Sequence, residues 1–121
     1  MDCGPTCIRM VTKYYGKNIN IEQLRQSAQI SKEGVSLLGI AEAAEKIGFN
    51  AKGVTLSYDE LIKEAKLPAV LHWEQNHFVV LYTVKSRFLL RRNDELRVAD
   101  PGKGMITYTK QEFLKYCIYH Q

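Results

Sequence analysis

The chain has little cysteine and no long apolar run. Its 3 cysteines are too few for a disulfide scaffold, and an odd number leaves one of them unpaired. No apolar run is long enough to span a membrane, and no charged-then-apolar signal peptide opens the chain. A hydrophobic content of 45% over 121 residues is typical of a folded domain. The sequence therefore predicts one globular domain, residues 1–121, in a reducing, cytoplasmic-type compartment.

The formal net charge of +4 is concentrated in one stretch. Between Lys85 and Arg97, five basic residues accompany two acidic ones, Asp94 and Glu95. This stretch is interpreted as a solvated strand pair with charged edges, or as a docking surface for acidic lipid or a partner domain. No nucleic-acid partner is expected, because nucleic-acid-binding proteins usually carry a wide basic stripe interleaved with aromatic residues. Phe88 is the only aromatic residue in this stretch.

The first half of the chain has the apolar periodicity of helices. The first expected helix has Pro5 in its first turn, ends at Gly16, and carries on one face Cys7, Val11, Tyr14 and Tyr15. A later stripe predicts another helix that ends at Gly48, with the apolar residues Leu37, Ile40, Ala41, Ala44 and Ile47.

Capping residues mark where the other helices begin. Asn20, with Gln23 three residues on, caps a second helix, and Ser36 opens the third. Ser57 and Glu60 form a capping box for a fourth helix, which Pro68 ends.

The second half of the chain changes to the period of strands. Short β-type runs are expected at residues 69–73, 77–84, 87–91, 95–99 and 105–108, with a strong turn at residues 100–104. Thr109 and Glu112 then cap a last helix that contains Phe113, Leu114 and Cys117. Helices followed by strands predict an α+β fold, with N-terminal helices packed on a C-terminal antiparallel sheet.

Cys3 is a candidate nucleophile because it lies directly before an expected helix. Unpaired backbone N–H groups and the helix dipole favour negative charge there. A thiol pKa is ordinarily about 8.5, and a helix N-terminus lowers it toward a reactive thiolate. The structural alternative is a small buried residue at a helix start.

His77 and Asp100 are candidates for the groups that would assist a thiolate. His77 begins an apolar strand after a polar turn, and Asp100 ends a strand before Pro101. Each also has an ordinary structural interpretation, as a hydrogen-bonded histidine and as a turn-forming aspartate. A nucleophilic thiolate needs a base, and the base needs a third group that holds its ring. Cys3, His77 and Asp100 supply these three parts in the order that papain-type peptidases use.

The sequence around these residues resembles the bacteriocin-processing cysteine peptidases, which cut double-glycine leaders. The resemblance covers essentially the whole chain and is carried by the strings Asp2-Cys3-Gly4-Pro5-Thr6-Cys7, Tyr14-Tyr15-Gly16, Gly34-Val35-Ser36-Leu37-Leu38-Gly39, Ala43-Ala44-Glu45, Ile47-Gly48-Phe49, Leu67-Pro68-Ala69, His72-Trp73, Asn76-His77-Phe78-Val79-Val80-Leu81 and Ala99-Asp100-Pro101.

The resemblance implies a papain-like domain at the N-terminus of a peptide-exporting ABC transporter, on the cytoplasmic side of the bacterial inner membrane. It implies a peptide substrate that is cut after a Gly-Gly pair, and transmembrane and nucleotide-binding domains as partners. Residue by residue, it implies Cys3 as the nucleophile, His77 as the general base and acid, and Asp100 as the group that orients His77. The family's leaders bind as amphipathic helices on an apolar surface.

Rival assignments remain for two of the three positions. His72 is the alternative base, because it lies five residues before His77 across a turn. Cys7 is expected to pack inside the helix, since its spacing from Cys3 is not the usual two-residue spacing of a redox pair. A metal site of Cys3, Cys7 and His77 lacks paired ligand spacing, so neither metal nor cofactor is expected.

The chain departs from the family pattern before the nucleophile. Family members carry a glutamine a few residues upstream that helps to form the oxyanion hole, whereas only Met1 and Asp2 precede Cys3 here. Loss of such a donor typically costs about 10²- to 10³-fold in rate. We therefore expect a domain that lacks a short N-terminal segment. The alternative functions are a weakly active or non-catalytic leader-docking module, and a different papain-fold amide-cleaving enzyme or acyl transferase.

Overall fold

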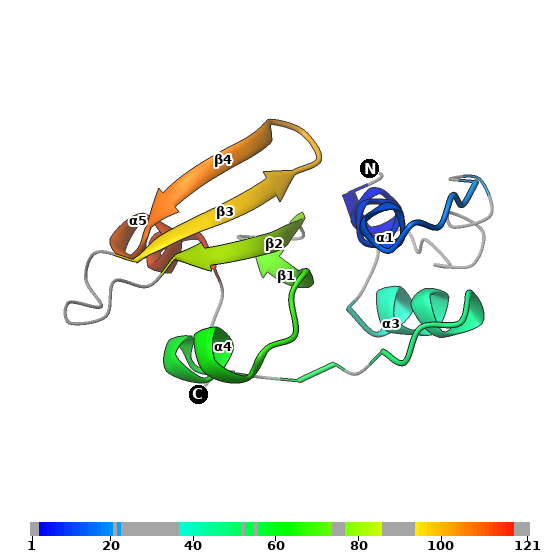
Figure 1. Cartoon of the computed structure of the whole chain (residues 1–121), viewed down its shortest axis with the longest axis horizontal. Coiled ribbons are helices and arrows are strands. Elements are labelled where there is room, and N and C mark those ends of the chain that lie inside the picture. The colour runs from blue at the N-terminus through cyan, green and yellow to red at the C-terminus, as the bar shows by residue number, and fades with distance from the viewer. Residues whose placement is uncertain are drawn as a thin grey trace. The chain divides into compact units, whose positions relative to one another are not determined.

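The computed structural model describes residues 3–20, 22, 37–51, 53–54, 56–73, 77–85 and 94–117. The chain divides into two compact units, Met1–Val54 and Thr55–Gln121. Figure 1 shows the helices of the first unit in blue and cyan, and the helices and strands of the second in green to red. None of the helices in the described ranges has the length and apolar character needed to cross a membrane.

The first unit contains helix α1, Cys3–Tyr14, and helix α3, Leu37–Lys46, which contact each other. Both helices end at a glycine with positive φ, +80° at Gly16 and +100° at Gly48. The residue after each glycine donates its backbone N–H to a carbonyl five residues back, from Lys17 to Thr12 at 2.8 Å and from Phe49 to Ala44 at 3.0 Å. Because only glycine adopts this conformation without strain, the sequence predicted both helix ends correctly.

The buried face of α1 differs from the predicted one. Cys7 is fully buried as expected, but Tyr14 and Tyr15 are 60% and 47% exposed. The buried positions beside Cys7 are instead Ile8 and Thr12. Apolar periodicity could not identify Thr12, because it is polar; its hydroxyl donates to the carbonyl of Arg9 at 2.8 Å, which makes its burial acceptable. The prediction of a face through Tyr14 and Tyr15 was therefore wrong at its C-terminal end.

Two of the predicted elements fall outside the described residues. One is the second helix, of which only the cap is seen: Oδ1 of Asn20 accepts the backbone N–H of Glu22 at 2.8 Å. The other is the strand at residues 87–91. Ser36, the predicted start of the third helix, also lies outside the described residues, and that helix is seen from Leu37.

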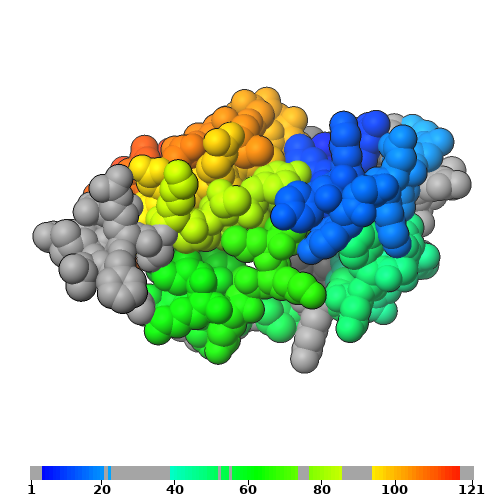
Figure 2. All heavy atoms as spheres, viewed as in Figure 1, coloured from blue at the N-terminus to red at the C-terminus, as the bar shows by residue number. Residues whose placement is uncertain are grey.

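The second unit is built on a four-stranded antiparallel sheet in the order β1-β2-β3-β4. Its strands are β1 Ala69–Trp73, β2 His77–Lys85, β3 Glu95–Asp100 and β4 Gly104–Thr109. On the face that Figure 2 shows, the atoms of β2, β3 and β4, yellow-green to orange, lie in continuous contact. All four ranges agree with predicted strands to within one residue at each end, which confirms the helices-then-sheet prediction.

The core of this unit lies on one face of the sheet. Side chains alternate along a strand, so the paired residues Leu81 and Val98 share this face with Val79. Helix α4, Tyr58–Glu64, and helix α5, Lys110–Tyr116, add aromatic and aliphatic side chains to it, and α5 contacts β4 and β3. The buried members of this core are Tyr58, Leu61, Trp73, Val79, Leu81, Leu96, Val98, Tyr108, Phe113 and Cys117.

The far end of the sheet is polar on its other face. A register shift between Leu81 and Thr83 changes which residues of β2 share a face with those of β3. Beyond it, Lys85 lies opposite Glu95, and Thr83 lies opposite Arg97, all four exposed. The described part of the stretch from Lys85 to Arg97 therefore has a solvated, charged face. This agrees with its interpretation as a solvated strand pair with charged edges.

Helices α4 and α5 begin with the two predicted capping boxes. In α4, the Ser57 hydroxyl accepts the N–H of Glu60 at 3.3 Å, and the Glu60 carboxylate accepts the N–H of Ser57 at 3.0 Å. Hydrogen bonds that the Ser57 backbone N–H and, to a smaller extent, the Ser57 side chain donate to the Glu60 carboxylate lower the pKa of Glu60 below its usual value. A carboxyl group whose pKa is lower in the folded chain than in the unfolded chain stabilises the fold fully at pH values above the unfolded-state pKa. This stabilisation is lost as the pH falls through the lowered pKa. Thr109 and Glu112 form the same arrangement in α5.

We expect Ser57→Ala to lower the free energy of unfolding by about 1 kcal/mol, because the N–H of Glu60 loses its side-chain acceptor. Ser57→Asp retains an acceptor at the same position and is expected to stay within about 0.5 kcal/mol of the unmodified chain. Urea unfolding monitored by circular dichroism measures both values. Equal losses in the two variants would show that the cap hydrogen bond does not stabilise α4.

Candidate active site

His77 lies at the start of β2, next to the core of the second unit. Alternation along the strand places it on the same face as Val79 and Leu81. Its side chain is 26% exposed, so the ring lies at the rim of the core, as the apolar neighbours in the sequence predicted. A histidine in this position can pack one edge of its ring against the core, while the exposed edge can exchange protons with solvent or substrate.

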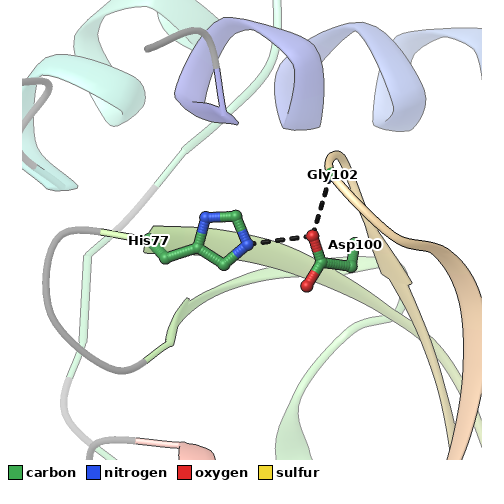
Figure 3. Close-up of polar contacts among 3 residues, drawn as sticks. All are labelled: His77, Asp100 and Gly102. Carbon is green, nitrogen blue, oxygen red and sulfur yellow. Dashed lines mark hydrogen bonds and ion pairs between the residues drawn. The ribbon is translucent and has the colours of Figure 1, made fainter.

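Asp100 lies at the end of β3, beside the start of β2. Neighbouring antiparallel strands run in opposite directions, so the first residue of β2 and the last residue of β3 meet at one end of the sheet. Nε2 of His77 lies 2.9 Å from Oδ1 of Asp100, and the Asp100 side chain is only 3% exposed. Figure 3 shows the ring and the carboxylate facing each other across this distance. The structure therefore brings together two of the three predicted site residues.

The contact between His77 and Asp100 determines which ring nitrogen is available for chemistry. When Asp100 is ionised, its carboxylate only accepts hydrogen bonds, so Nε2 of His77 then carries the donated hydrogen. In the neutral ring, Nδ1 is then the nitrogen with a lone pair. This arrangement leaves Nδ1 as the atom that accepts or donates a proton, while Nε2 remains bound to Asp100.

His72, the rival base, lies on the opposite face of the sheet. It pairs with Phe78 across β1 and β2, whereas His77 pairs with Trp73. Paired residues share a face, so His72 and His77 point away from each other. The His72 ring stacks on Phe78, with 5.2 Å between the ring centroids and 22° between the planes. Of the two histidines, His77 is therefore the one that contacts Asp100.

Cys3 lies in the first unit and is the first residue of α1. This confirms the prediction that it lies at a helix start, where backbone N–H groups have no partner within the helix. Cys7, one turn further along α1, is fully buried, in agreement with the expected packing role. Within the described ranges, no three His, Cys, Asp or Glu side chains are grouped closely enough to hold a metal ion.

Gly102 is a member of this site that the sequence analysis did not single out. Its backbone N–H donates to Oδ1 of Asp100 at 2.8 Å, as Figure 3 shows. The signal was present in the run Asp100-Pro101-Gly102, which was interpreted only as a turn. Asp100 is in fact both a turn former and the partner of His77, so its two interpretations are compatible.

Curated relatives match nearly the whole chain. The colicin V secretion/processing ATP-binding protein CvaB of Escherichia coli is 35% identical over 116 residues, which is 95% of this chain and 15% of that protein. The lactococcin-G-processing and transport ATP-binding protein LagD of Lactococcus lactis is 38% identical over 121 residues, 94% of this chain and 16% of that protein. The chain thus spans about one sixth of the length of these relatives.

Solved structures show the same fold. A double glycine motif protease from an AMS/PCAT transporter, in complex with its leader peptide, has a TM-score of 0.86 and 32% identity, covering 98% of this chain and 79% of that one. The peptidase domain of Streptococcus ComA has a TM-score of 0.83 and 28% identity, covering 98% and 86%. The fold is thus the predicted α+β, papain-like one. A family model described as the peptidase C39 family matches residues 1–117. The chain belongs to the peptidase C39 family of cysteine peptidases.

Proposed function

We propose that this chain cleaves a precursor peptide after a Gly-Gly pair at the end of its leader, with Cys3, His77 and Asp100 as the catalytic residues. The observation that carries the proposal is the 2.9 Å contact between Nε2 of His77 and Oδ1 of Asp100. The position of Cys3 at the start of α1 supports it, because that position favours a thiolate. The similarity to a double glycine motif protease crystallised with its leader peptide supports the substrate class.

The domain acts as part of a larger peptide exporter in this proposal. The relatives that match it are processing and secretion or transport ATP-binding proteins, of which it covers 15% to 16%. Residues 1–121 would form one papain-like peptidase domain on the cytoplasmic side of the membrane, with the transmembrane and nucleotide-binding domains of an ABC transporter as partners. The leader would then be removed while the cargo is exported.

The reaction is acyl transfer through a thioester. The Cys3 thiolate attacks the carbonyl carbon of the second glycine, and the carbonyl oxygen becomes an oxyanion. The backbone N–H of Cys3 can stabilise that oxyanion, because the first N–H groups of a helix have no partner within the helix. Protonated His77 then donates the proton on Nδ1 to the leaving amine, and the peptide bond breaks.

Water completes the reaction. Nδ1 of His77 accepts a proton from a water molecule that attacks the thioester, and the leader is released as a carboxylate. Nε2 of His77 stays bound to Asp100 throughout, so the ring keeps its orientation in both half-reactions. Glycine at the cleaved position suits a narrow cleft, since larger side chains would clash with its walls.

We expect Cys3→Ala to abolish cleavage of a leader–cargo peptide, because no thioester can form. The protein is incubated with a Gly-Gly precursor under reducing conditions, and the products are identified by mass spectrometry. Unmodified protein should release the cargo with its new N-terminus directly after the second glycine. The same assay is run on a chain extended at its N-terminus with a glutamine-bearing segment. If both chains bind the precursor and neither cleaves it, the result would instead favour a leader-docking module.

The two histidines provide a matched pair of variants. His77→Ala should lower kcat by about 10²- to 10⁴-fold, the usual contribution of a positioned general acid–base group. His72→Ala removes a ring of the same type from the opposite face of the same strand pair and should stay within about threefold of the unmodified rate. Steady-state kinetics on the same peptide measures both. The reverse ranking would identify His72 as the base.

Asp100→Asn and Asp100→Ala separate the hydrogen bonds of this residue from its side-chain volume. His77 and Gly102 both contact Oδ1 of the carboxylate, and an amide oxygen can accept the same two N–H groups. Asp100→Ala should lower kcat by about 10- to 100-fold, since hydrogen bonds to a charged group are worth about 1.5–3 kcal/mol. Asp100→Asn should retain most of the activity that the alanine variant loses. Equal losses in both variants would mean that Asp100 does not act by accepting these bonds.

A further inference from the structure

The turn after β3 is closed twice by Asp100. Its backbone carbonyl accepts the N–H of Lys103 at 3.1 Å, and its carboxylate oxygen Oδ1 accepts the N–H of Gly102 at 2.8 Å. Pro101 between them has no N–H. Gly102 therefore carries the first backbone donor after Asp100, and the turn brings that donor to the carboxylate.

One hydrogen bond alone would not fix the Asp100 side chain. An aspartate has two side-chain torsions, and a single hydrogen bond to one oxygen restrains them weakly. The Gly102 N–H belongs to a closed turn, so its direction is set by the backbone. The Gly102 N–H and Nε2 of His77 bind the same oxygen, Oδ1 of Asp100. By holding Oδ1, the Gly102 N–H therefore also sets the position of the acceptor for Nε2.

We propose that the backbone N–H of Gly102 is a positioning group for the reaction, which holds Oδ1 of Asp100 where His77 binds it. The proposal rests on the catalytic roles proposed above for His77 and Asp100. Gly102 itself touches neither substrate nor nucleophile in this assignment; it acts through Asp100. The competing explanation is that the Gly102–Asp100 bond only stabilises the turn.

The test replaces the amide of Gly102 by an ester, with glycolic acid incorporated at this position in cell-free translation. The ester removes the N–H donor and leaves no new side chain. We expect kcat for the Gly-Gly precursor to fall by about 5- to 50-fold, and KM to stay within about twofold. An unchanged kcat, or a loss in KM alone, would overturn the proposal.

Gly102→Ala is the matched control, because it keeps the N–H. An added Cβ would lie 3.6 Å from Oδ1 of Asp100, an ordinary contact, and Gly102 does not have the positive φ that Gly16, Gly48 and Gly104 have. Because the N–H is kept, this variant should lose less kcat than the ester variant, and an equal loss in both would overturn the proposal. Combining the ester with Asp100→Ala gives a double-mutant cycle. The ester should have less than about a twofold effect on kcat when Asp100 is absent. Equal effects in both backgrounds would show that the Gly102 N–H does not act through Asp100 and would overturn the proposal.

Nuclear magnetic resonance gives a readout that needs no activity. The ¹⁵N shifts of the His77 ring should show the hydrogen on Nε2 in the unmodified chain, and a mixture of tautomers in the ester variant and in Asp100→Ala. An unchanged tautomer in the ester variant would overturn the positioning role, even if the precursor were never cleaved. If the ester prevents folding, the test is a scalar coupling across the hydrogen bond in the unmodified chain, between ¹⁵N of Gly102 and the carboxyl ¹³C of Asp100. The presence of this coupling supports the proposal, and its absence overturns it.

Discussion

The nearly buried carboxylate of Asp100 is the constraint on which the site depends. Removing a charge from water is costly unless hydrogen bonds replace the lost hydration. Here two N–H donors, from His77 and Gly102, lie 2.9 Å and 2.8 Å from the same oxygen. The sheet supplies one of them through the pairing of β2 with β3, and the turn supplies the other. The same bonds therefore compensate the buried charge and orient the ring.

The cost of that charge explains why the β3–β4 connection has its particular sequence. A proline directly after Asp100 removes the N–H that would otherwise come first, and the glycine that follows supplies one at the correct distance. Gly104, with φ +88°, then returns the chain to β4 in a conformation that other residues rarely adopt. The turn between β3 and β4 thus also holds the side chain that contacts His77.

Much of this arrangement could be predicted from the sequence, for reasons that differ between residues. Helix ends at Gly16 and Gly48 and the capping boxes at Ser57 and Thr109 depend on local chemistry, which the sequence shows directly. The contact of His77 with Asp100 was predicted by family resemblance and strand order. The burial of Thr12 was missed because polar residues do not contribute to apolar periodicity. The contact of the Gly102 N–H with Asp100 was missed because the run Asp100-Pro101-Gly102 was interpreted only as a turn.

Strand register decides which histidine can reach Asp100. Side chains alternate with a period of two, so a shift of β2 by one residue would put Phe78 where His77 lies and turn His77 to the other face. The observed register is held by burial on both faces, since Phe78, Val79 and Val80 are at most 2% exposed. A slip would leave Phe78 at the rim and bury the imidazole, which is unfavourable at both positions. The apolar residues after His77 therefore specify the position of His77 as well as the core.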